Sequence, residues 1–80
     1  MQTIDLHGYL VEDAIEEVEN IIGKIRLDGR EEVIKVITGH GKIQKQLMFY
    51  LLDHGIEHIF EPRNMGAFII TVDWKSALTP

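Results

Sequence analysis

Two long stretches of the chain place apolar residues at the spacing of an amphipathic helix. They recur every three or four positions from residue 10 to residue 28 and again from residue 43 to residue 54, and Gly29 and Gly55 follow the two stretches. Residues at this spacing share one helical face, and glycine commonly follows the last helical residue. The pattern predicts two helices, with buried faces formed by Ala14, Val18, Ile21, Ile22 and Ile25, and by Ile43, Leu47, Tyr50 and Leu51.

Four shorter stretches are typical of strands. Residues 3–6 form the first, and residues 33–37 form a second that is β-branched and nearly continuous in its apolar character. Such a continuous run favours a strand that is covered on both faces. Residues 57–61 and 67–72 form two more strands around the turn-forming cluster 62–66, which predicts a hairpin.

The predicted order of elements is βαβαββ. This order implies an α/β (α+β) two-layer sandwich, in which two helices pack on a four-stranded mixed sheet. A right-handed crossover between the first two strands brings their carboxyl ends to the same edge of the sheet. We expect a single domain over residues 1–74 and a short C-terminal tail over residues 75–80.

Composition excludes several classes of protein. The chain of 80 residues has no cysteine, which excludes a disulfide framework and a cysteine-based zinc site. No apolar run is long enough to cross a bilayer, and no signal peptide is visible. We therefore expect a soluble, cytoplasmic domain without a membrane partner.

The net charge of −5 is unusual for a protein that binds nucleic acid, because phosphates are generally met by a basic face. Five acids are concentrated in the first predicted helix, and the remaining eight are balanced by eight lysines and arginines. The five are typical of a solvated helix face. They are Glu12, Asp13, Glu16, Glu17 and Glu19.

Two similar tetrapeptides occur where a predicted strand gives way to a predicted helix. The first is Asp5-Leu6-His7-Gly8 and the second is Thr38-Gly39-His40-Gly41. Ligands of open α/β sheets bind outside the carboxyl ends of the strands. We therefore expect one crevice surrounded by Asp5, His7, Thr38 and His40.

These residues are suited to cleavage of a phosphodiester bond by water. Histidine transfers protons near neutral pH, so His7 is the candidate general base, with Asp5 two residues earlier as the group that orients it. His40 is the candidate partner across the crevice, as an acid or as a donor to phosphate. The three candidate catalytic residues are thus Asp5, His7 and His40.

The same edge is suited to phosphate binding, because each turn precedes a helix N-terminus with unpaired backbone N–H groups. Glycines allow the backbone to approach a phosphate closely, and lysines add positive charge. The candidate phosphate-binding residues are Gly8, Thr38, Gly39, Gly41, Lys42, Lys45 and, at the hairpin, Arg63.

The two tetrapeptides, together with Tyr50-Leu51 and Gly66-Ala67, resemble the Smr (small MutS-related) domain family over nearly the whole chain. The resemblance implies a βαβαββ fold similar to the C-terminal domain of bacterial translation initiation factor three. It also implies nucleic-acid binding with endonuclease or nicking activity on DNA or RNA. Members occur alone or joined to other domains, so a larger protein related to mismatch repair or associated with ribosomes is an expected context.

The resemblance also implies roles for individual residues: Asp5 and His7 in cleavage, and Gly39 and Gly41 in substrate binding. The second turn is shorter than in many members of the family and lacks a further glycine, and two positions also differ from the family pattern. Leu10 stands where a capping threonine is common, and Gln44 stands where arginine or lysine is common.

Two alternatives to a metal-free nuclease stay open at this stage. The first is a noncatalytic module that binds nucleic acid or phosphate, which the residues at positions 10 and 44 favour. The second is a divalent-metal site made of two histidines and one carboxylate, namely Asp5, His7 and His40.

Overall fold

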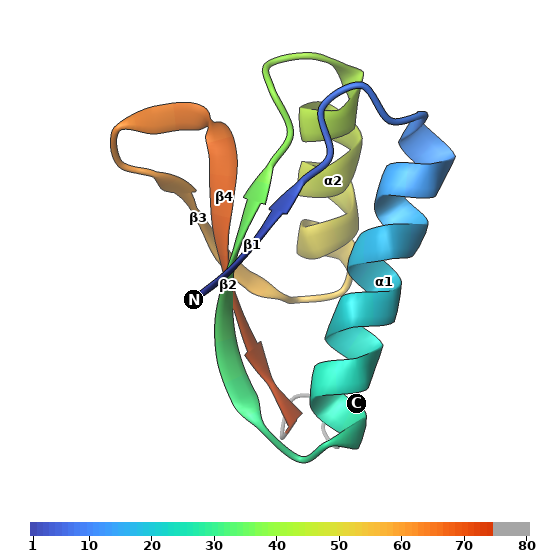
Figure 1. The fold of residues 1–80 in the computed structure, drawn as a ribbon, viewed down its shortest axis with the longest axis vertical. Helices are drawn as coiled ribbons and strands as arrows, with labels where there is room; N and C mark the ends of the chain where they lie inside the picture. Colours follow the sequence, from blue (N-terminus) through green and yellow to red (C-terminus); the bar gives the residue numbers. More distant parts are fainter. Residues whose placement is uncertain (75–80) are drawn as a thin grey trace.

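The computed structural model describes residues 1–74 as one layer of helices on one sheet (Figure 1). The short tail expected at residues 75–80 lies outside the described residues. The elements follow the predicted order: β1 (Gln2–Asp5), α1 (Val11–Leu27), β2 (Glu31–Ile37), α2 (Lys42–Asp53), β3 (Glu57–Glu61) and β4 (Asn64–Asp73). The predicted α+β class, with two helices on a four-stranded mixed sheet, is confirmed.

The four strands lie in the order β1-β2-β4-β3. β1 and β2 are parallel, while β4 runs antiparallel to both β2 and β3. Because β1 and β2 run the same way, the turns that follow them lie at one edge of the sheet. Figure 1 shows the β3–β4 hairpin at this end of the molecule as well. We call this end the loop edge.

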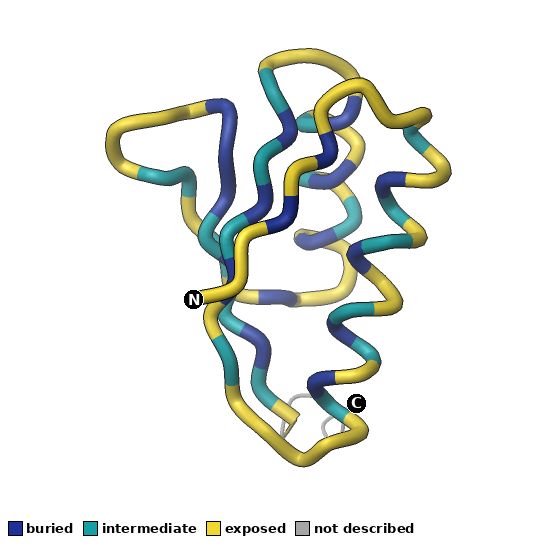
Figure 2. The backbone as a smooth tube through the Cα atoms, viewed as in Figure 1, coloured by how far each residue is buried: buried dark blue, intermediate teal, exposed yellow. Residues whose placement is uncertain are grey.

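One face of the sheet carries the core. The strand register aligns Ile4, Val36 and Phe68 in one row across β1, β2 and β4, and all three are buried. Both helices cover this face, and α1 contributes Ala14, Val18, Ile22 and Ile25 to the core. Figure 2 shows how buried and exposed residues alternate along the chain.

The other face of the sheet is not covered by any described element. In β2, only Ile34 and Val36 are buried, whereas Val33 is exposed. The expectation that residues 33–37 are covered on both faces is therefore wrong. The apolar residues on the open face, such as Val33 and Ile59, reflect β-propensity rather than burial.

Two element boundaries can be compared with those that the sequence predicts. Leu10 is the N-cap of α1 and makes no side-chain capping hydrogen bond, as its lack of a polar group predicts. The hairpin turn is shorter than the expected 62–66, because β4 begins at Asn64 and only Pro62 and Arg63 form the turn. None of the helices in residues 1–74 is long and apolar enough to cross a membrane.

The Gly23→Ala variant should be more stable than the wild type by about 0.5–1 kcal/mol, because alanine loses less backbone entropy than glycine inside a helix. Gly23 lies within α1, and an added Cβ meets no atom within 4 Å. Urea denaturation measures the difference. As a control, Gly29→Ala should lose about 1 kcal/mol, since Gly29 has a φ of +68° that strains an L-residue. A Gly23→Ala protein less stable than the wild type contradicts this account.

Candidate functional site

Asp5 and His7 form an exposed pair at the end of β1. The carboxylate oxygen Oδ1 of Asp5 accepts a hydrogen bond from the backbone N–H of His7 at 3.1 Å and lies 2.8 Å from Nδ1 of its ring. An ionised carboxylate can only accept, so Nδ1 carries the proton and Nε2 is left as an acceptor. The side chains of His7 and Asp5 are 74% and 52% exposed, so a ligand in solution can reach them.

The same contacts favour the charged form of the carboxylate. The hydrogen bond from the His7 ring, followed by the one from its backbone N–H, holds the pKa of Asp5 below its ordinary value. The stabilisation from this pair is therefore present above the ordinary pKa of aspartate and is lost as the pH falls through the lowered pKa. Solvent screens the exposed pair, so its contribution to folding is small. Its main consequence is an oriented imidazole at neutral pH.

The second turn, residues 38–41, is anchored by one carbonyl of the hairpin. The backbone O of Gly66 accepts hydrogen bonds from the backbone N–H groups of Thr38 at 2.8 Å and Gly39 at 3.0 Å. The buried hydroxyl of Thr38 also lies 3.2 Å from this oxygen and 2.9 Å from the O of Gly39. Thr38 thus uses both of its donors to hold the turn in place.

The turn leaves the start of α2 available to an anion. Gly41 is the N-cap of α2, and no side chain caps this end. The first N–H groups of a helix have no partner within the helix, and they attract negative charge. The first turn of α2 contains Lys42 and no acidic residue. This end of α2 therefore combines open donors with positive charge.

A groove of about 590 Å³ lies between the two turns. Residues from the first turn and the start of α1 line one side, and residues from the second turn and the start of α2 line the other. Among the predicted binding residues, Gly8, Thr38, Gly41 and Lys42 lie here. The structure thus brings four of the expected residues to one groove, although Glu12 at the start of α1 adds a negative charge to it.

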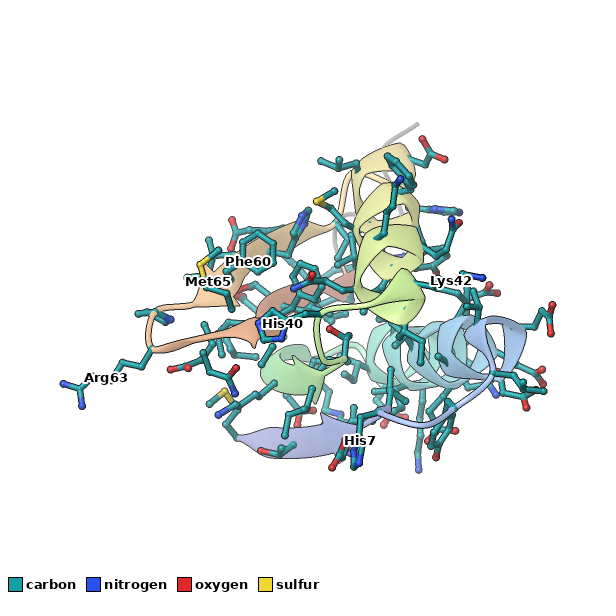
Figure 3. The ribbon with its side chains drawn as sticks, turned by 90° about the horizontal axis from the view of Figure 1, so that it is seen from above. His7, His40, Lys42, Phe60, Arg63 and Met65 are labelled. Carbon is teal, nitrogen blue, oxygen red and sulfur yellow. The ribbon has the colours of Figure 1, made fainter. Side chains whose placement is uncertain are left out.

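His40 lies on the opposite side of the second turn from this groove. A Cβ added to Gly66 would be 3.1 Å from Cε1 of His40, so the imidazole packs over the hairpin. Gly66 is two residues before Phe68 and shares its helix-covered face, whereas Asp5 follows Ile4 and lies on the open face. Figure 3 shows His40 between α2 and the hairpin, with His7 on the far side beside β1.

The remaining predicted residues occupy separate places. Lys45 is exposed on α2 and lines a second groove beside the hairpin, together with His40. Arg63 projects from the tip of the hairpin, away from both turns (Figure 3). The metal set of Asp5, His7 and His40 is not formed, because no three side chains that could hold a metal converge anywhere in residues 1–74. The separation of His40 from the other two explains this result.

Two side-chain contacts that shape the site were not predicted from the sequence. The side-chain amide of Gln44 donates a hydrogen bond to the backbone O of Met65, and the side chain of Asn64 accepts one from the N–H of Gly66 at 3.0 Å. Gln44 thus joins α2 to the hairpin. Met65 is 21 residues from Gln44, so no local signal pointed to this contact.

The fold and the loop edge together define a small α+β domain that carries an Asp–His pair and a glycine-rich turn on neighbouring strands. The family model of the Smr domain matches residues 4–71, and the chain belongs to this family of nucleic-acid-binding, nuclease-like domains. The crystal structure of the Smr domain of Thermus thermophilus MutS2 has the same fold, with a TM-score of 0.77 and 18% sequence identity. The comparison covers 90% of this chain and 98% of that chain. No match was found among curated proteins.

Proposed function

We propose that this domain is an endonuclease that binds DNA or RNA at the loop edge and hydrolyses a phosphodiester bond. The observation that carries the proposal is the contact of 2.8 Å between Asp5 and His7, which leaves the Nε2 atom of an exposed histidine free to accept a proton. Membership of the Smr family supports nucleic acid as the substrate.

The proposed reaction needs only water and the side chains at the end of β1. Nε2 of His7 takes a proton from a water molecule as its oxygen forms a bond to phosphorus. The bond from phosphorus to the leaving oxygen breaks, and that oxygen takes a proton from solvent. Asp5 is the positioning residue, because it fixes the tautomer of His7 and stabilises the imidazolium that forms.

The backbone of the substrate is held by the second turn and α2. Phosphate groups meet the open N–H groups at the start of α2, near Gly41, and the charge of Lys42. Gly8 and Gly39 have no side chain, so the protein backbone can approach the phosphate closely at these positions. Gly39 also adopts a φ of +75°, which favours glycine. Because His40 lies toward the hairpin, we assign it to a neighbouring phosphate of the same nucleic-acid strand, to which an N–H of its ring donates a hydrogen bond.

A second candidate function is binding without cleavage. The groove between the turns is lined by Gly8, Thr38, Gly41 and Lys42, but neither Asp5 nor His7 lines it. A phosphate bound in the groove therefore does not by itself contact the candidate general base. This placement is suited to a recognition module that holds nucleic acid for another domain.

Gel-shift and cleavage assays on labelled single-stranded, duplex and branched DNA and on structured RNA, at low salt, test the proposal. Binding and cleavage of at least one substrate are expected, because the loop edge offers both open donors and an oriented base. The Asp5→Ala variant, purified in the same way, controls for contaminating nucleases. It should bind equally well and cleave at least about tenfold more slowly, because general-base catalysis depends on the orientation of the base.

The other outcomes distinguish the two functions. Binding without cleavage by the wild type supports the recognition module. Equal cleavage by both proteins contradicts a role for the Asp5–His7 pair, and the absence of binding to every substrate contradicts both functions.

A further inference from the structure

A second groove at the loop edge lies on the hairpin side of the second turn. It has a volume of about 580 Å³ and runs between α2 and the β3–β4 hairpin. Its lining includes His40, Lys42, Gln44, Lys45, Met48 and Phe60. In Figure 3, His40 and Phe60 lie between the start of α2 and the hairpin, with Met65 close to Phe60. Neither Asp5 nor His7 lines this groove.

The wall formed by the hairpin is aromatic. Phe60 stacks on the buried ring of Phe68, with centroids 4.9 Å apart and planes inclined by 22°. Only one face of the Phe60 ring is used in this stack, and the residue also lines the groove and is half-buried. The thioether of Met48 adds a polarisable apolar group to the lining. The groove therefore offers a supported aromatic surface to a flat ligand.

The charge of the groove is of one sign. Lys42 and Lys45 line it, and no aspartate or glutamate is among its lining residues. The only acid in α2 is Asp53, at the opposite end of the helix. This local excess of positive charge contrasts with the net charge of −5 of the whole chain. A ligand that combines a flat apolar ring with a nearby anion matches both properties.

Hydrogen bonds fix both walls of the groove relative to each other. The amide of Gln44 on α2 bonds to the carbonyl of Met65 on the hairpin. The carbonyl of Gly66 accepts hydrogen bonds from the backbone N–H groups of Thr38 and Gly39, which secures the turn that carries His40. A site that is already ordered loses less conformational entropy when its ligand binds.

We propose that this groove binds one unpaired nucleotide of the substrate, with its base against Phe60 and a flanking phosphate near Lys45. The inference rests on the proposed function, since it names the class of nucleic acid that the domain selects. A base in a duplex has both faces covered by its neighbours, whereas an unpaired base can stack on an aromatic side chain. The domain therefore prefers single-stranded segments and strand junctions over intact duplex.

Fluorescence anisotropy with an unstructured single strand and a blunt-ended duplex of two separate strands, both of the same nucleic acid, tests the preference. The wild type should bind the single strand at least tenfold more tightly. The Phe60→Leu variant keeps apolar volume beside Phe68 but removes the stacking surface. It should lose about five- to a hundredfold in affinity for the single strand and stay within twofold for the duplex.

Thermal melting shows whether the Phe60→Leu variant is folded. If it is not, a second variant tests the same groove. Lys45→Gln alters an exposed side chain, and it should lower the salt dependence of single-strand binding by about 0.7 in the slope of log K against log salt. The matched control Lys24→Gln, on the last turn of α1, should behave as the wild type.

The outcomes separate this inference from the proposed function. Equal wild-type affinity for the two probes, equal weakening of both by Phe60→Leu, or an unchanged salt slope in Lys45→Gln overturns the nucleotide site and leaves the proposed function standing. Binding to neither probe by the wild type overturns both.

Discussion

The His7→Gln variant should cleave nucleic acid about a hundred- to ten-thousandfold more slowly than the wild type, because general-base catalysis contributes about this factor. Glutamine preserves a polar side chain of similar reach but does not take a proton from water near neutral pH. Binding should change by less than twofold, since His7 does not line the groove at which phosphate is expected. Single-turnover cleavage rates and gel shifts measure the two quantities separately.

His54→Gln is a suitable control for this substitution. His54 is an exposed histidine at the C-terminal end of α2, where its Nδ1 lies 2.9 Å from the backbone O of Tyr50. The His54→Gln variant should cleave nucleic acid at the wild-type rate. If the His7→Gln variant also retains the wild-type rate, His7 is not the general base, and an equal loss of binding and cleavage assigns it to substrate binding instead.

The Phe68→Ala variant should lose about 3–5 kcal/mol of its free energy of unfolding, because the substitution removes a large apolar side chain and leaves a cavity. Phe68 is fully buried in β4, stacks on Phe60 and meets the ring of His58 edge-on at 5.8 Å. A small domain has a total stability of only roughly 5–15 kcal/mol, so a loss of this size should lower the urea concentration at which the variant unfolds. Urea denaturation followed by circular dichroism gives the difference.

Phe49→Ala is the matched control, since it makes the same change at a residue that is 46% exposed on α2. Its loss should stay below about 1 kcal/mol, because a partly exposed ring removes less surface from water. Comparable losses in the two variants would contradict the placement of Phe68 at the centre of the core.

The elements and their order were predictable because they depend on local pattern. The apolar residues of α1 repeat at helical spacing, and Gly29 and Gly55, which follow the two helices, have positive φ. The error at β2 has a physical cause. Val33 and Ile37 favour an extended chain whether or not a layer covers them, so an apolar strand does not reveal how many of its faces are buried.

The two halves of the candidate site differed in how far sequence could predict them. Asp5 and His7 are two residues apart at the end of a strand, and this short separation determines their contact. The position of His40 depends on Gly66, whose backbone O holds Thr38 and Gly39 in place from a distant part of the chain. The sequence predicted one crevice shared by His7 and His40. The structure instead places the two histidines on different sides of the second turn.

The sequence by itself determined the order of the elements and the pairing of Asp5 with His7, because both depend on residues close together in the chain. It also determined the loop edge, because the right-handed crossover between β1 and β2 brings their carboxyl ends to the same edge. Only the tertiary structure decided which side of the loop edge each group occupies. The hydrogen bonds responsible join Thr38 to Gly66 and Gln44 to Met65, across separations of 28 and 21 residues. Such contacts form only when the sheet and α2 pack together. Their geometry, and the shape of the groove between α2 and the hairpin, are therefore visible only in the folded structure.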